Sequence, residues 1–563
     1  RVIKRAGKVR ELEAALPKRL RGAPGIAHTR WATHGVPNDA NAHPHCDTGE
    51  RFAVVHNGII ENAAALRANL ISRGHTLTSD TDTELLAHLI AAAQGPALVE
   101  RVREALGNIE GTYGIAVIDA HEPDCIVVAR NGSPVVLGIG DREMHVASDI
   151  SALVRHTHQV VHLDDGELAV VRQNGFETST LDARPTTKKA STINWDVSSY
   201  ERGDFEHYML KEISEQPQSC ARTLSGRIEQ RFDSAHLGGL NLSARDLLDI
   251  RRIKILGCGS AYYAGLAGAH IIESLTRIPT DAEAASEFRY RNPVIEKDVL
   301  YIAVSQSGET LDTLMALQEV RRKGGRVLGV VNVVGSTIAR ECDGGIYIHA
   351  GPEISVASTK TFTSTAIAFA LFALHVGRIR DLGPSEGRRL INALEKLPDQ
   401  IAQITENTEQ VKAVASKYSD AQNMFFIGRA GAYPIALEGA QKLKEIAYVH
   451  AQAYPAAELK HGPLALVSPQ TPTVAIIPDG PLFAKSIGSI EEIRARLGPV
   501  IALGHEGVAN AGADAVLTVP KTEPELDPIL LNVPLQLFAY YAARALKRDI
   551  DQPRNLAKSV TVE

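Results

Sequence analysis

The sequence predicts a multidomain protein of the α/β and α+β classes, in which a β-rich first domain precedes two doubly wound parallel α/β domains. Three observations lead to this prediction. A chain of 563 residues is too long for one hydrophobic core and suits about three domains. Residues 25–172 consist mainly of short apolar runs separated by turn-forming residues. Residues 244–553 contain an internal repeat of apolar strands and amphipathic helices, as in parallel sheets covered by helices.

The amino-acid composition restricts the possible classes of function. Hydrophobic residues make up 44% of the chain and charged residues 22%, as in ordinary soluble globular proteins. A net charge of −6 gives no general attraction to nucleic acid or anionic membranes, so neither is expected as a partner. Five scattered cysteines without a CxxC pair indicate a reducing compartment, without a disulfide framework or a zinc site. The most apolar segment, near 364–377, is too short to cross a bilayer, and residues 1–20 lack a signal-peptide apolar stretch, so we expect a cytoplasmic protein.

The first domain is predicted from short strands that end in polar residues. The expected strands are residues 25–35, 51–61, 112–118, 125–129 and 168–171. A helix is expected over 83–93, directly after a polar run at 79–82. Residues 183–192 are polar and unpatterned, and this composition favours a linker.

The second half of the chain is organised by the internal repeat. Residues 255–268 align without gaps with residues 426–439, and three further strands correspond in the same order. These strand pairs are Val299–Val304 with Thr473–Ile477, 325–331 with 498–503, and 346–348 with 516–518. Because apolar strands alternate with amphipathic helices in each copy, each copy is predicted to be a doubly wound parallel sandwich.

A hydroxyl-rich turn follows the apolar strand Val299–Val304 in the first copy. The apolar spacing becomes helical from about Leu311, so the turn stands at a helix N-terminus, where N–H groups and the helix dipole favour an anion. The turn has no lysine, which excludes a nucleotide P-loop and favours a sugar phosphate; the alternative is a polar turn that only caps the helix. The second copy has residues 478–480, Pro-Asp-Gly, at this place, so only the first copy is expected to bind phosphate. The predicted phosphate ligands are Ser305, Gln306, Ser307 and Thr310.

The motifs of the two halves together resemble a known family. Duplicated α/β units with a serine-rich turn after the second strand are similar to SIS (sugar isomerase) domains. The order of a β-rich domain, a linker, two such units and a short tail resembles the glutamine–fructose-6-phosphate aminotransferase (isomerizing), or glucosamine-6-phosphate synthase, family. The motifs that carry the resemblance are residues 29–35, 56–58, 81–84, 305–310, 356–360, 438–445, 458–463 and 551–563.

The resemblance implies a set of domain boundaries. An N-terminal nucleophile-type glutaminase domain of αββα layers, truncated at its start, is expected at 1–180. Two SIS domains are expected at 244–383 and 415–553. The connecting parts are a linker at 181–205, a helical lead-in at 206–243, a helical connection at 384–414 and a catalytic tail at 554–563.

The resemblance also implies an activity. The family transfers the amide nitrogen of L-glutamine to D-fructose 6-phosphate and isomerises the product to D-glucosamine 6-phosphate, with release of L-glutamate. It needs no cofactor, and ammonia would pass internally from one domain to the other. Two alternatives stay open, an ammonia-dependent SIS isomerase or deglycase and a non-catalytic SIS sensor of sugar phosphates. The sensor has no need of Lys558, Glu445 or His461, and all three are present.

Four residues are implied in the amine chemistry on the sugar. Lys558 is similar in position to the family lysine that forms a Schiff base with the ketose. For this role it must be partly neutral, so the apolar tail is expected to desolvate it. Glu445 is implied as the proton shuttle between C1 and C2, with Lys442 holding it and the sugar hydroxyls. His461 is similar to the histidine that opens the furanose ring, which in the family is donated to the neighbouring subunit, and this implies a homodimer.

Other residues around the sugar have two interpretations. From the residues alone, Glu438, Lys442 and Glu445 share one face of a predicted helix, and the alternative to a catalytic role is a surface ion-pair ladder. Ala261 stands where some family members have a hydroxyl residue, which puts one sugar contact in doubt. The further sugar contacts that the resemblance implies are Ser260, Val356, Ser358 and Ala557.

A glutamine pocket is predicted in the first domain. Arg30 and Asp82 suit the α-carboxylate and α-ammonium groups of an amino acid. Asn57 and Gly58 end a strand, where a side-chain amide and a backbone N–H can form an oxyanion hole. Zinc is not expected at residues 43–46 because no second pair of ligands accompanies them. The other predicted pocket residues are Trp31, Thr33, His34 and His43.

The nucleophile of the glutaminase is expected outside this sequence. Class II glutamine amidotransferases use an N-terminal cysteine whose own α-amine acts as the base. No Cys-Gly-Ile start stands at Arg1, and Cys46 is internal without a free amine. We therefore expect that the start of the domain is missing, as in a fragment, and that the glutaminase half is inactive as written.

Overall fold

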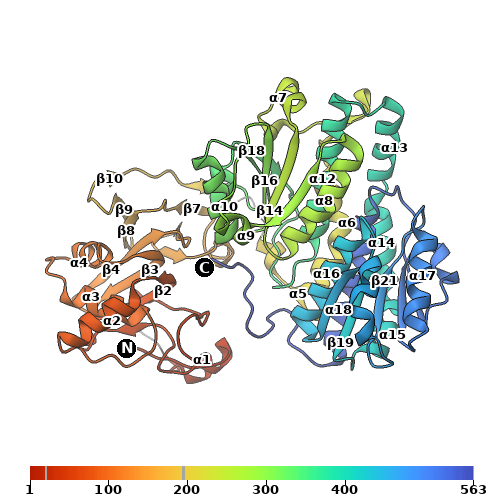
Figure 1. The fold of residues 1–563 in the computed structure, drawn as a ribbon. Coiled ribbons are helices and arrows are strands. Elements are labelled where there is room, and N and C mark those ends of the chain that lie inside the picture. Colours follow the sequence, from red (N-terminus) through yellow and green to blue (C-terminus); the bar gives the residue numbers. More distant parts are fainter. Residues whose placement is uncertain (20–21, 193–196, 562–563) are drawn as a thin grey trace. The chain divides into compact units, whose positions relative to one another are not determined.

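The computed structural model describes residues 1–19, 22–192 and 197–561, and the chain divides into two compact units (Figure 1). The first unit comprises Arg1–Ser198 together with Val560–Glu563, and the second comprises Ser199–Ser559. Each unit has hydrophobic cores of its own, and each is described separately below.

The first unit is built on two antiparallel sheets. The strand order is β1-β2-β3-β4-β8-β9-β10 in the seven-stranded sheet and β11-β7-β5-β6 in the four-stranded sheet. The strands of the larger sheet are β1 (His45–Cys46), β2 (Phe52–Ile60), β3 (Gly111–Asp119), β4 (Glu122–Asn131), β8 (Glu167–Arg172), β9 (Gly175–Thr180) and β10 (Pro185–Thr186). Those of the smaller sheet are β5 (Val136–Ile139), β6 (Met144–Ala147), β7 (Gln159–His162) and β11 (Ser191–Thr192).

Side chains alternate along the central strands and fill one core on each face of the larger sheet. Val54 and Val117 belong to the core shared with helices, whereas Val55 and Ala116 belong to the core shared with the smaller sheet. The described residues therefore form three layers, helices, larger sheet and smaller sheet, of the expected αββα arrangement. The helices of this unit are α1 (Val9–Ala15), α2 (Ala63–Ser72), α3 (Thr83–Ala92) and α4 (Leu98–Leu106).

Most of the predicted elements of this unit are confirmed, and one is wrong. The strands expected at 51–61, 112–118, 125–129 and 168–171 and the helix expected at 83–93 are present. Residues 25–35, however, belong to neither sheet. Arg30 donates hydrogen bonds to the main-chain oxygens of His34 and Gly35, and these bonds fold the segment into a loop. The expected linker at 181–205 includes strands β10 and β11, and its residues 193–196 lie outside the described residues.

The second unit contains two five-stranded parallel sheets with the same strand order. The first sheet is β15-β14-β16-β17-β18 and the second is β20-β19-β21-β22-β23, so each reads 2-1-3-4-5 along its own copy. The strands are β14 (Arg252–Gly257), β15 (Thr280–Ala284), β16 (Val299–Ser305), β17 (Arg326–Val331), β18 (Gly344–Tyr347), β19 (Asn423–Gly428), β20 (His450–Pro455), β21 (Thr473–Ile476), β22 (Val500–Gly504) and β23 (Ala515–Thr518). The doubly wound repeat predicted from the sequence is confirmed.

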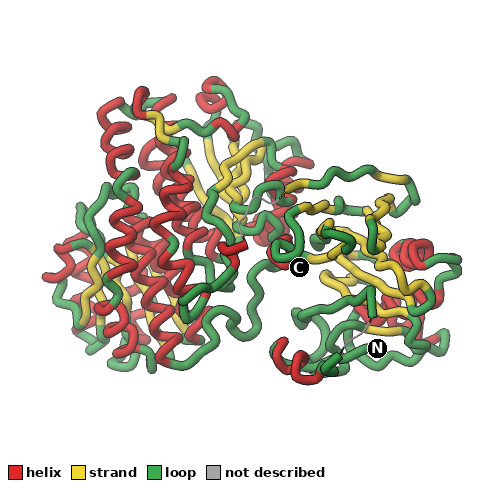
Figure 2. Tube along the Cα trace, turned by 180° about the vertical axis from the view of Figure 1, so that it is seen from behind, coloured by secondary structure: helices red, strands yellow, loops and turns green. Residues whose placement is uncertain are grey.

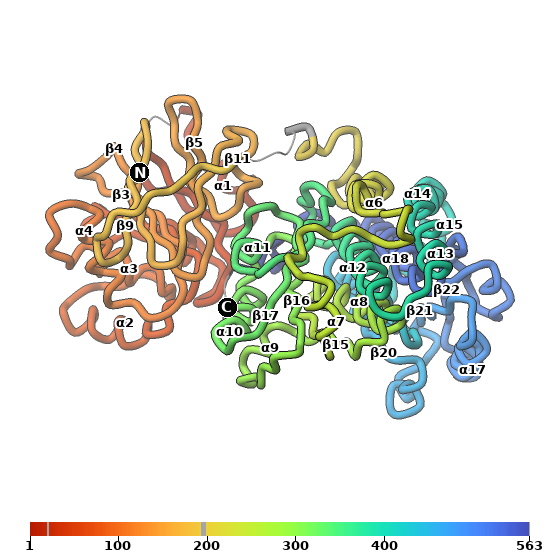
Figure 3. Tube along the Cα trace, turned by 90° about the horizontal axis from the view of Figure 1, so that it is seen from above, coloured from red at the N-terminus to blue at the C-terminus, as the bar shows by residue number. Residues whose placement is uncertain are grey.

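The helices of the second unit join the two copies through one continuous core. Helix α8 packs on α12 and on α16, and α16 packs on α18, so the first helices of both copies meet in the middle of the unit (Figures 1 and 2). At the rim, α6 packs against α14 (Figure 3). The α-helices are α5 (Tyr208–Ser214), α6 (Gln216–Leu224), α7 (Ala244–Asp249), α8 (Ser260–Thr276), α9 (Ala285–Tyr290), α10 (Leu311–Arg322), α11 (Thr337–Glu341), α12 (Lys360–Ile379), α13 (Pro384–Leu394), α14 (Leu397–Glu406), α15 (Glu409–Tyr418), α16 (Ala432–Ala447), α17 (Phe483–Arg494) and α18 (Asp527–Ala545).

Helix α12 corrects one argument made from the sequence. The apolar segment was expected to be too short to cross a bilayer, yet the helix runs over 20 residues and is, among the described helices, the one long and apolar enough to do so. Its apolar stretch is 83% buried inside the unit. Phe362, Phe369 and Phe372 are all part of the central core, so α12 is a core helix.

Candidate active site

The predicted sugar residues gather at the switch point of the first sheet. In a sheet of order 2-1-3-4-5, ligands bind outside the carboxyl ends of the first and third strands, where the connections diverge. Here these strands are β14 and β16, which pair with each other. Ser260 begins α8 just after β14, and the hydroxyl-rich turn follows β16 directly. The fold therefore brings these two predicted contacts to one edge of the sheet.

The hydroxyl-rich turn is shaped by its own side chains. Ser305 Oγ accepts a hydrogen bond from the Gly308 N–H at 2.9 Å and lies 2.9 Å from Thr310 Oγ1. Ser307 Oγ accepts from the Glu309 N–H at 3.1 Å. The contact between Ser305 and Thr310 uses one hydroxyl hydrogen, so the other hydroxyl of this pair and that of Ser307 remain available to donate to a phosphate. Gly308 has a φ of +68° and a Cβ there would lie 1.9 Å from the Ser336 hydroxyl, so no other residue fits.

The turn leads into α10, which begins at Leu311 as predicted. Gln306 and Thr310 are half-buried, and Ser305 and Ser307 are buried. At the corresponding place of the second copy, Asp479 follows β21. A carboxylate there repels phosphate, which agrees with the prediction that only the first copy holds one.

A buried polar cluster connects the two copies beside this edge. Lys442 on α16 donates to Ser260 Oγ at 3.0 Å and to Glu445 Oε2 at 2.6 Å. Ser260 in turn donates to Glu438 Oε1 at 3.0 Å. The side chains of Glu438 and Lys442 are fully buried, and that of Glu445 is 16% exposed. The alternative of a surface ion-pair ladder is therefore wrong, because these charges lie between α8 and α16.

Charge within the cluster is unevenly distributed. Burial raises the pKa of Glu438 to about 7, the Lys442 ammonium opposes this shift, and the neighbouring Glu445 adds to it. Burial acts to lower the pKa of Lys442, but Glu438 and Glu445 outweigh it, so this pKa is raised. Lys442 is therefore a permanent ammonium group that orients the Glu445 carboxylate.

Lys558 meets a carboxylate that sequence reasoning had not assigned to the site. Its Nζ donates to Glu353 Oε2 at 2.5 Å. Glu353 is buried and also accepts bonds from the Thr359 N–H at 2.9 Å and the Thr361 hydroxyl at 2.7 Å. Burial acts to raise the pKa of Glu353, but Lys558 and these donors lower it to about 2. In the sequence, Glu353 follows the strand 346–348 as Glu523 follows its counterpart 516–518, and this correspondence is the only signal for the residue.

The surroundings of Lys558 differ from the expected apolar cover. Its side chain is 22% exposed and forms an ion pair with the fully buried Glu353 side chain, because the tail runs beside a polar turn. Ala557, next to it, is exposed. The predicted tail 554–563 is divided, since Val560 and Thr561 group with the first unit and residues 562–563 lie outside the described part.

The turn after Glu353 carries two more predicted sugar contacts. The Val356 N–H donates to the main-chain oxygen of Asp551 at 3.1 Å, which ties this turn to the beginning of the tail. Ser358 Oγ lies 2.7 Å from Thr361 Oγ1 at the start of α12. The first of these contacts places the turn beside the chain that carries Lys558.

His461 is not brought to this cluster. It ends the 3-10 helix Ala456–His461, and its side chain is exposed. Among the contacts between described residues, no hydrogen bond or ion pair joins it to Lys442, Glu445 or Lys558.

In the first unit, one pocket collects most of the predicted glutamine residues. It is lined by Arg30, Trp31, Thr33, His43, Asn57, Gly58 and Asp82, and also by His28, His56, Thr81 and Thr83. The last four were not predicted as site residues, although three of them lie inside motifs that the sequence analysis identified. His34 is not part of the lining, but its Nδ1 lies 3.2 Å from Thr33 Oγ1.

The strand end in this pocket has the geometry of an amide site. His28 Nε2 lies 2.8 Å from Asn57 Oδ1, so the carbonyl side of this amide is occupied and its NH₂ group is the available donor. Gly58 has a φ of +130°, and a Cβ there would lie 2.1 Å from the Thr112 oxygen, so glycine is required. Asp82 Oδ2 accepts from the Ile60 N–H at 3.0 Å.

The histidines near this pocket are uncharged at neutral pH. Burial lowers the pKa of His28 to about 4 and that of His45 to about 4 as well, and it lowers the pKa of His43 and His56. Arg30 is therefore the cation of the pocket lining.

Among the described residues, the group that could hold a metal ion is Glu143, His145 and His156, whose ligand atoms lie within 4.8 Å of one another, and it does not include residues 43–46.

Comparisons with known proteins identify the domains of both units. Residues 28–155 match the family described as glutamine amidotransferase domain, and residues 246–375 and 417–546 each match SIS domain. The C-terminal domain of glucosamine-fructose-6-phosphate aminotransferase from Francisella tularensis is a similar solved structure, with a TM-score of 0.60, 34% identity, and coverage of 62% of this chain and 100% of that one.

Full-length relatives are similar along the whole chain. The protein named glutamine–fructose-6-phosphate aminotransferase [isomerizing] from a strain of Thermus thermophilus is 47% identical over 568 residues, which cover 100% of this chain and 93% of the relative. The protein of the same name from Chlorobaculum tepidum is 44% identical over 573 residues, with the same coverage. This chain therefore belongs to the glutamine–fructose-6-phosphate aminotransferase (isomerizing) family.

Proposed function

We propose that this protein transfers the amide nitrogen of L-glutamine to D-fructose 6-phosphate and isomerises the product to D-glucosamine 6-phosphate, releasing L-glutamate. The observation that supports this most directly is the contact of Lys442 with both Ser260 and Glu445. This contact joins the sugar crevice of the first SIS copy to acid–base groups of the second copy, which a module that only binds sugar does not need. The names of the Thermus and Chlorobaculum relatives state the same activity for those proteins.

On the sugar side, each group has one task. The turn after β16 binds the phosphate through its hydroxyl and backbone donors. Lys558, once it has lost a proton, attacks the C2 carbonyl through Nζ, and loss of water leaves an imine. Ammonia then adds to C2 and displaces Nζ, so the new nitrogen stays on the sugar and Lys558 is released. The Glu445 carboxylate takes a proton from C1 and returns it to C2, while the Lys442 ammonium keeps the carboxylate in place. Glu353 stabilises the charged form of Lys558 and must yield this contact before the attack.

We also propose that the active unit is a homodimer. His461 is exposed at the end of its 3-10 helix, and it lacks a described contact to the other catalytic residues of its own chain. This placement fits a histidine that opens the furanose ring in the neighbouring copy. Mixing the two inactive variants His461→Ala and Lys558→Ala should then restore activity, because a hybrid dimer has one site with both residues intact. If subunit exchange is demonstrated and no activity returns, donation of His461 across the interface is contradicted.

On the glutamine side, Arg30 and Asp82 would bind the α-carboxylate and α-ammonium groups, and Asn57 with Gly58 would stabilise the oxyanion. A thiol attacks as a thiolate, yet burial raises the pKa of every cysteine in residues 1–563. These cysteines are Cys46, Cys125, Cys220, Cys258 and Cys342. A polypeptide of residues 1–563 should therefore release no glutamate from glutamine.

The deciding experiment supplies fructose 6-phosphate with glutamine or ammonium to residues 1–563 and quantifies aldose phosphate, glucosamine 6-phosphate and glutamate. We expect conversion of the ketose without release of glutamate. Lys558→Ala is the control and should abolish the conversion. Tight sugar binding without any conversion by the folded chain would contradict the proposal and favour the sensor.

A further inference from the structure

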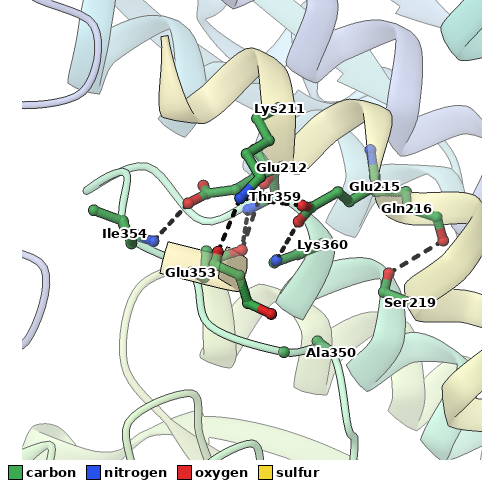
Figure 4. Close-up of polar contacts among 12 residues, drawn as sticks. Lys211, Glu212, Glu215, Gln216, Ser219, Ala350, Glu353, Ile354, Thr359 and Lys360 are labelled. Carbon is green, nitrogen blue, oxygen red and sulfur yellow. Dashed lines mark hydrogen bonds and ion pairs between the residues drawn. The ribbon is translucent and has the colours of Figure 1, made fainter. Parts of the chain in front are cut away.

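A second buried carboxylate lies behind Glu353. Glu212 on α5 is 2% exposed, and its Oε1 accepts hydrogen bonds from the N–H groups of Ile354 at 2.5 Å and Ser355 at 3.1 Å. Figure 4 shows this carboxylate pointing from α5 toward the main chain of Ile354. Its other oxygen, Oε2, is buried and has no hydrogen-bond partner among the described residues. None of the roles derived above uses this residue.

The charges around Glu212 leave no counter-ion for it. On its own helix, Lys211 and Glu215 lie 3.4 Å apart. From α12, Lys360 donates to Glu215 at 2.6 Å (Figure 4). From the tail, Lys558 donates to Glu353 at 2.5 Å. Each nearby lysine thus already has a carboxylate partner.

Glu212 is consequently stable in its neutral form. An isolated buried carboxylate costs far more than a buried carboxylic acid. Burial raises the pKa of Glu212 to about 8, and the neighbouring Glu353 adds to this shift, against the opposing effects of Lys558 and Lys360. At neutral pH Glu353, in the turn, is therefore ionised, whereas Glu212, on α5, is a neutral acid.

The turn between these two acids is held from two sides. Glu212 binds the N–H groups of Ile354 and Ser355, and the main-chain oxygen of Asp551 accepts from the next N–H, that of Val356. The Asp551 carboxylate also accepts from the first N–H groups of α5 at 2.8 and 2.9 Å. Helix α5 and the tail thus hold the main chain that carries the Glu353 carboxylate.

We propose that Glu212 is a positioning residue for the amine chemistry: through its bonds to the 354–355 main chain it holds the turn that presents Glu353 to Lys558. This inference rests on the proposed function of Lys558. An ionised Glu212 would repel the Glu353 carboxylate and disturb its position. The added negative charge would also stabilise the charged ammonium form of Lys558, whereas the neutral amine is the form that attacks the sugar. Activity should fall when Glu212 ionises.

The test compares kcat for fructose 6-phosphate conversion by wild type and Glu212→Gln between pH 7 and pH 9. Glutamine keeps one carbonyl acceptor and cannot ionise, so the ratio of variant kcat to wild-type kcat should rise about tenfold over this range, the change expected for a group of pKa about 8. The matched control is Glu206→Gln, an exposed residue near the start of the same helix that pairs with Arg544, and its profile should follow wild type.

Two outcomes would overturn the inference. If the pH profiles of kcat for an active wild type and for Glu212→Gln are parallel, ionisation of Glu212 has no effect on catalysis. If Glu212→Gln is folded but inactive at pH 7, the reaction needs the carboxylate form of Glu212. The infrared difference spectrum between pH 7 and pH 9 provides a second measurement. Wild type should lose more protonated-carboxyl absorbance than Glu212→Gln, because Glu438 titrates in both proteins, and equal losses also contradict the proposal. A wild type without sugar conversion at any pH would instead refute the proposed function.

Discussion

Lys442 and Ser260 are 182 positions apart in the sequence and belong to different SIS copies, yet they share a partly buried hydrogen bond of 3.0 Å. The serine hydroxyl accepts from Lys442 and donates to Glu438, so one oxygen atom connects a buried cation with a buried acid. Because the side chains of Glu438 and Lys442 are fully buried, both depend on this hydroxyl for a polar contact.

Ser260→Ala should therefore reduce both stability and catalysis. Loss of hydrogen bonds to two charged buried groups is expected to cost about 1–3 kcal/mol of unfolding free energy. The kcat for sugar conversion should fall because Lys442 no longer holds Glu445 in one position. Urea unfolding and steady-state kinetics measure the two effects. Ser274→Ala, an exposed serine on the same helix, is the control, and equal effects of both changes would contradict this role of Ser260.

Lys558 should form an imine with fructose 6-phosphate. Borohydride reduction in the presence of the sugar should add one hexose phosphate at Lys558, which peptide mass mapping identifies. The exposed Lys547, shortly before the tail, serves as an internal control and should remain unmodified. Labelling at other lysines, or none in a folded sample that binds the sugar, is the result that excludes this assignment.

Substitutions in the hydroxyl-rich turn and in its counterpart should show which of the two SIS copies binds the phosphate. Ser307→Ala and Thr310→Ala should each weaken sugar-phosphate binding by about 1–3 kcal/mol, the usual loss when a hydrogen bond to a charged group is removed. Asp479→Ala, in the corresponding turn of the second copy, should leave the affinity unchanged. Isothermal titration calorimetry measures all three variants, and an equal loss from Asp479→Ala would mean that the phosphate is assigned to the wrong copy.

Glu84 should make the first unit sensitive to acid. Its carboxylate accepts four bonds of 2.7 Å from the N–H and hydroxyl groups of Thr78 and Ser79, which precede the pocket residues Thr81 and Asp82. Burial acts to raise the pKa of Glu84, but the hydrogen bonds from His88, Thr78 and Ser79 lower it below its ordinary value. The stabilisation is therefore present above the unfolded pKa of about 4.5 and is lost as the pH falls below it.

Glu84→Gln should accordingly lower the unfolding free energy by about 1–3 kcal/mol at pH 7. The difference from wild type should shrink as the pH falls below about 4.5, because only wild type loses this contribution on acidification. Denaturant unfolding at several pH values provides the measurement, with the exposed Glu61→Gln as the control. A difference that stays constant down to pH 3 would argue against an ionic contribution.

The sequence was most informative where the chain buries apolar strands. Strands such as Val299–Ser305, buried along their whole length, form recognisable apolar runs, and their repetition predicted two parallel sheets. The strands Thr280–Ala284 and His450–Pro455 were missed because each mixes polar with apolar side chains and forms no continuous apolar run.

Site residues were predictable when they stood inside a turn or motif and much less so when burial defines their role. The hydroxyl-rich turn and the helix face of Lys442 were visible as local spacing. Glu212 and Glu353 were not, because nothing in their local sequence shows that a charged side chain is enclosed. Lys558 and its partner Glu353 are 205 positions apart in the sequence, so no local sequence pattern shows their contact.

The packing of α8 against α16 has a consequence for how such a protein can arise. The first copy supplies the phosphate turn and Ser260, whereas the second supplies Glu438, Lys442 and Glu445 to the same crevice. Neither copy is a complete enzyme, and a single ancestral copy would have needed to pair with another copy to assemble these groups. Joining the two in one polypeptide fixes their ratio at one to one and lets the copies differ at this place, where the first has the hydroxyl-rich turn and the second has Pro-Asp-Gly.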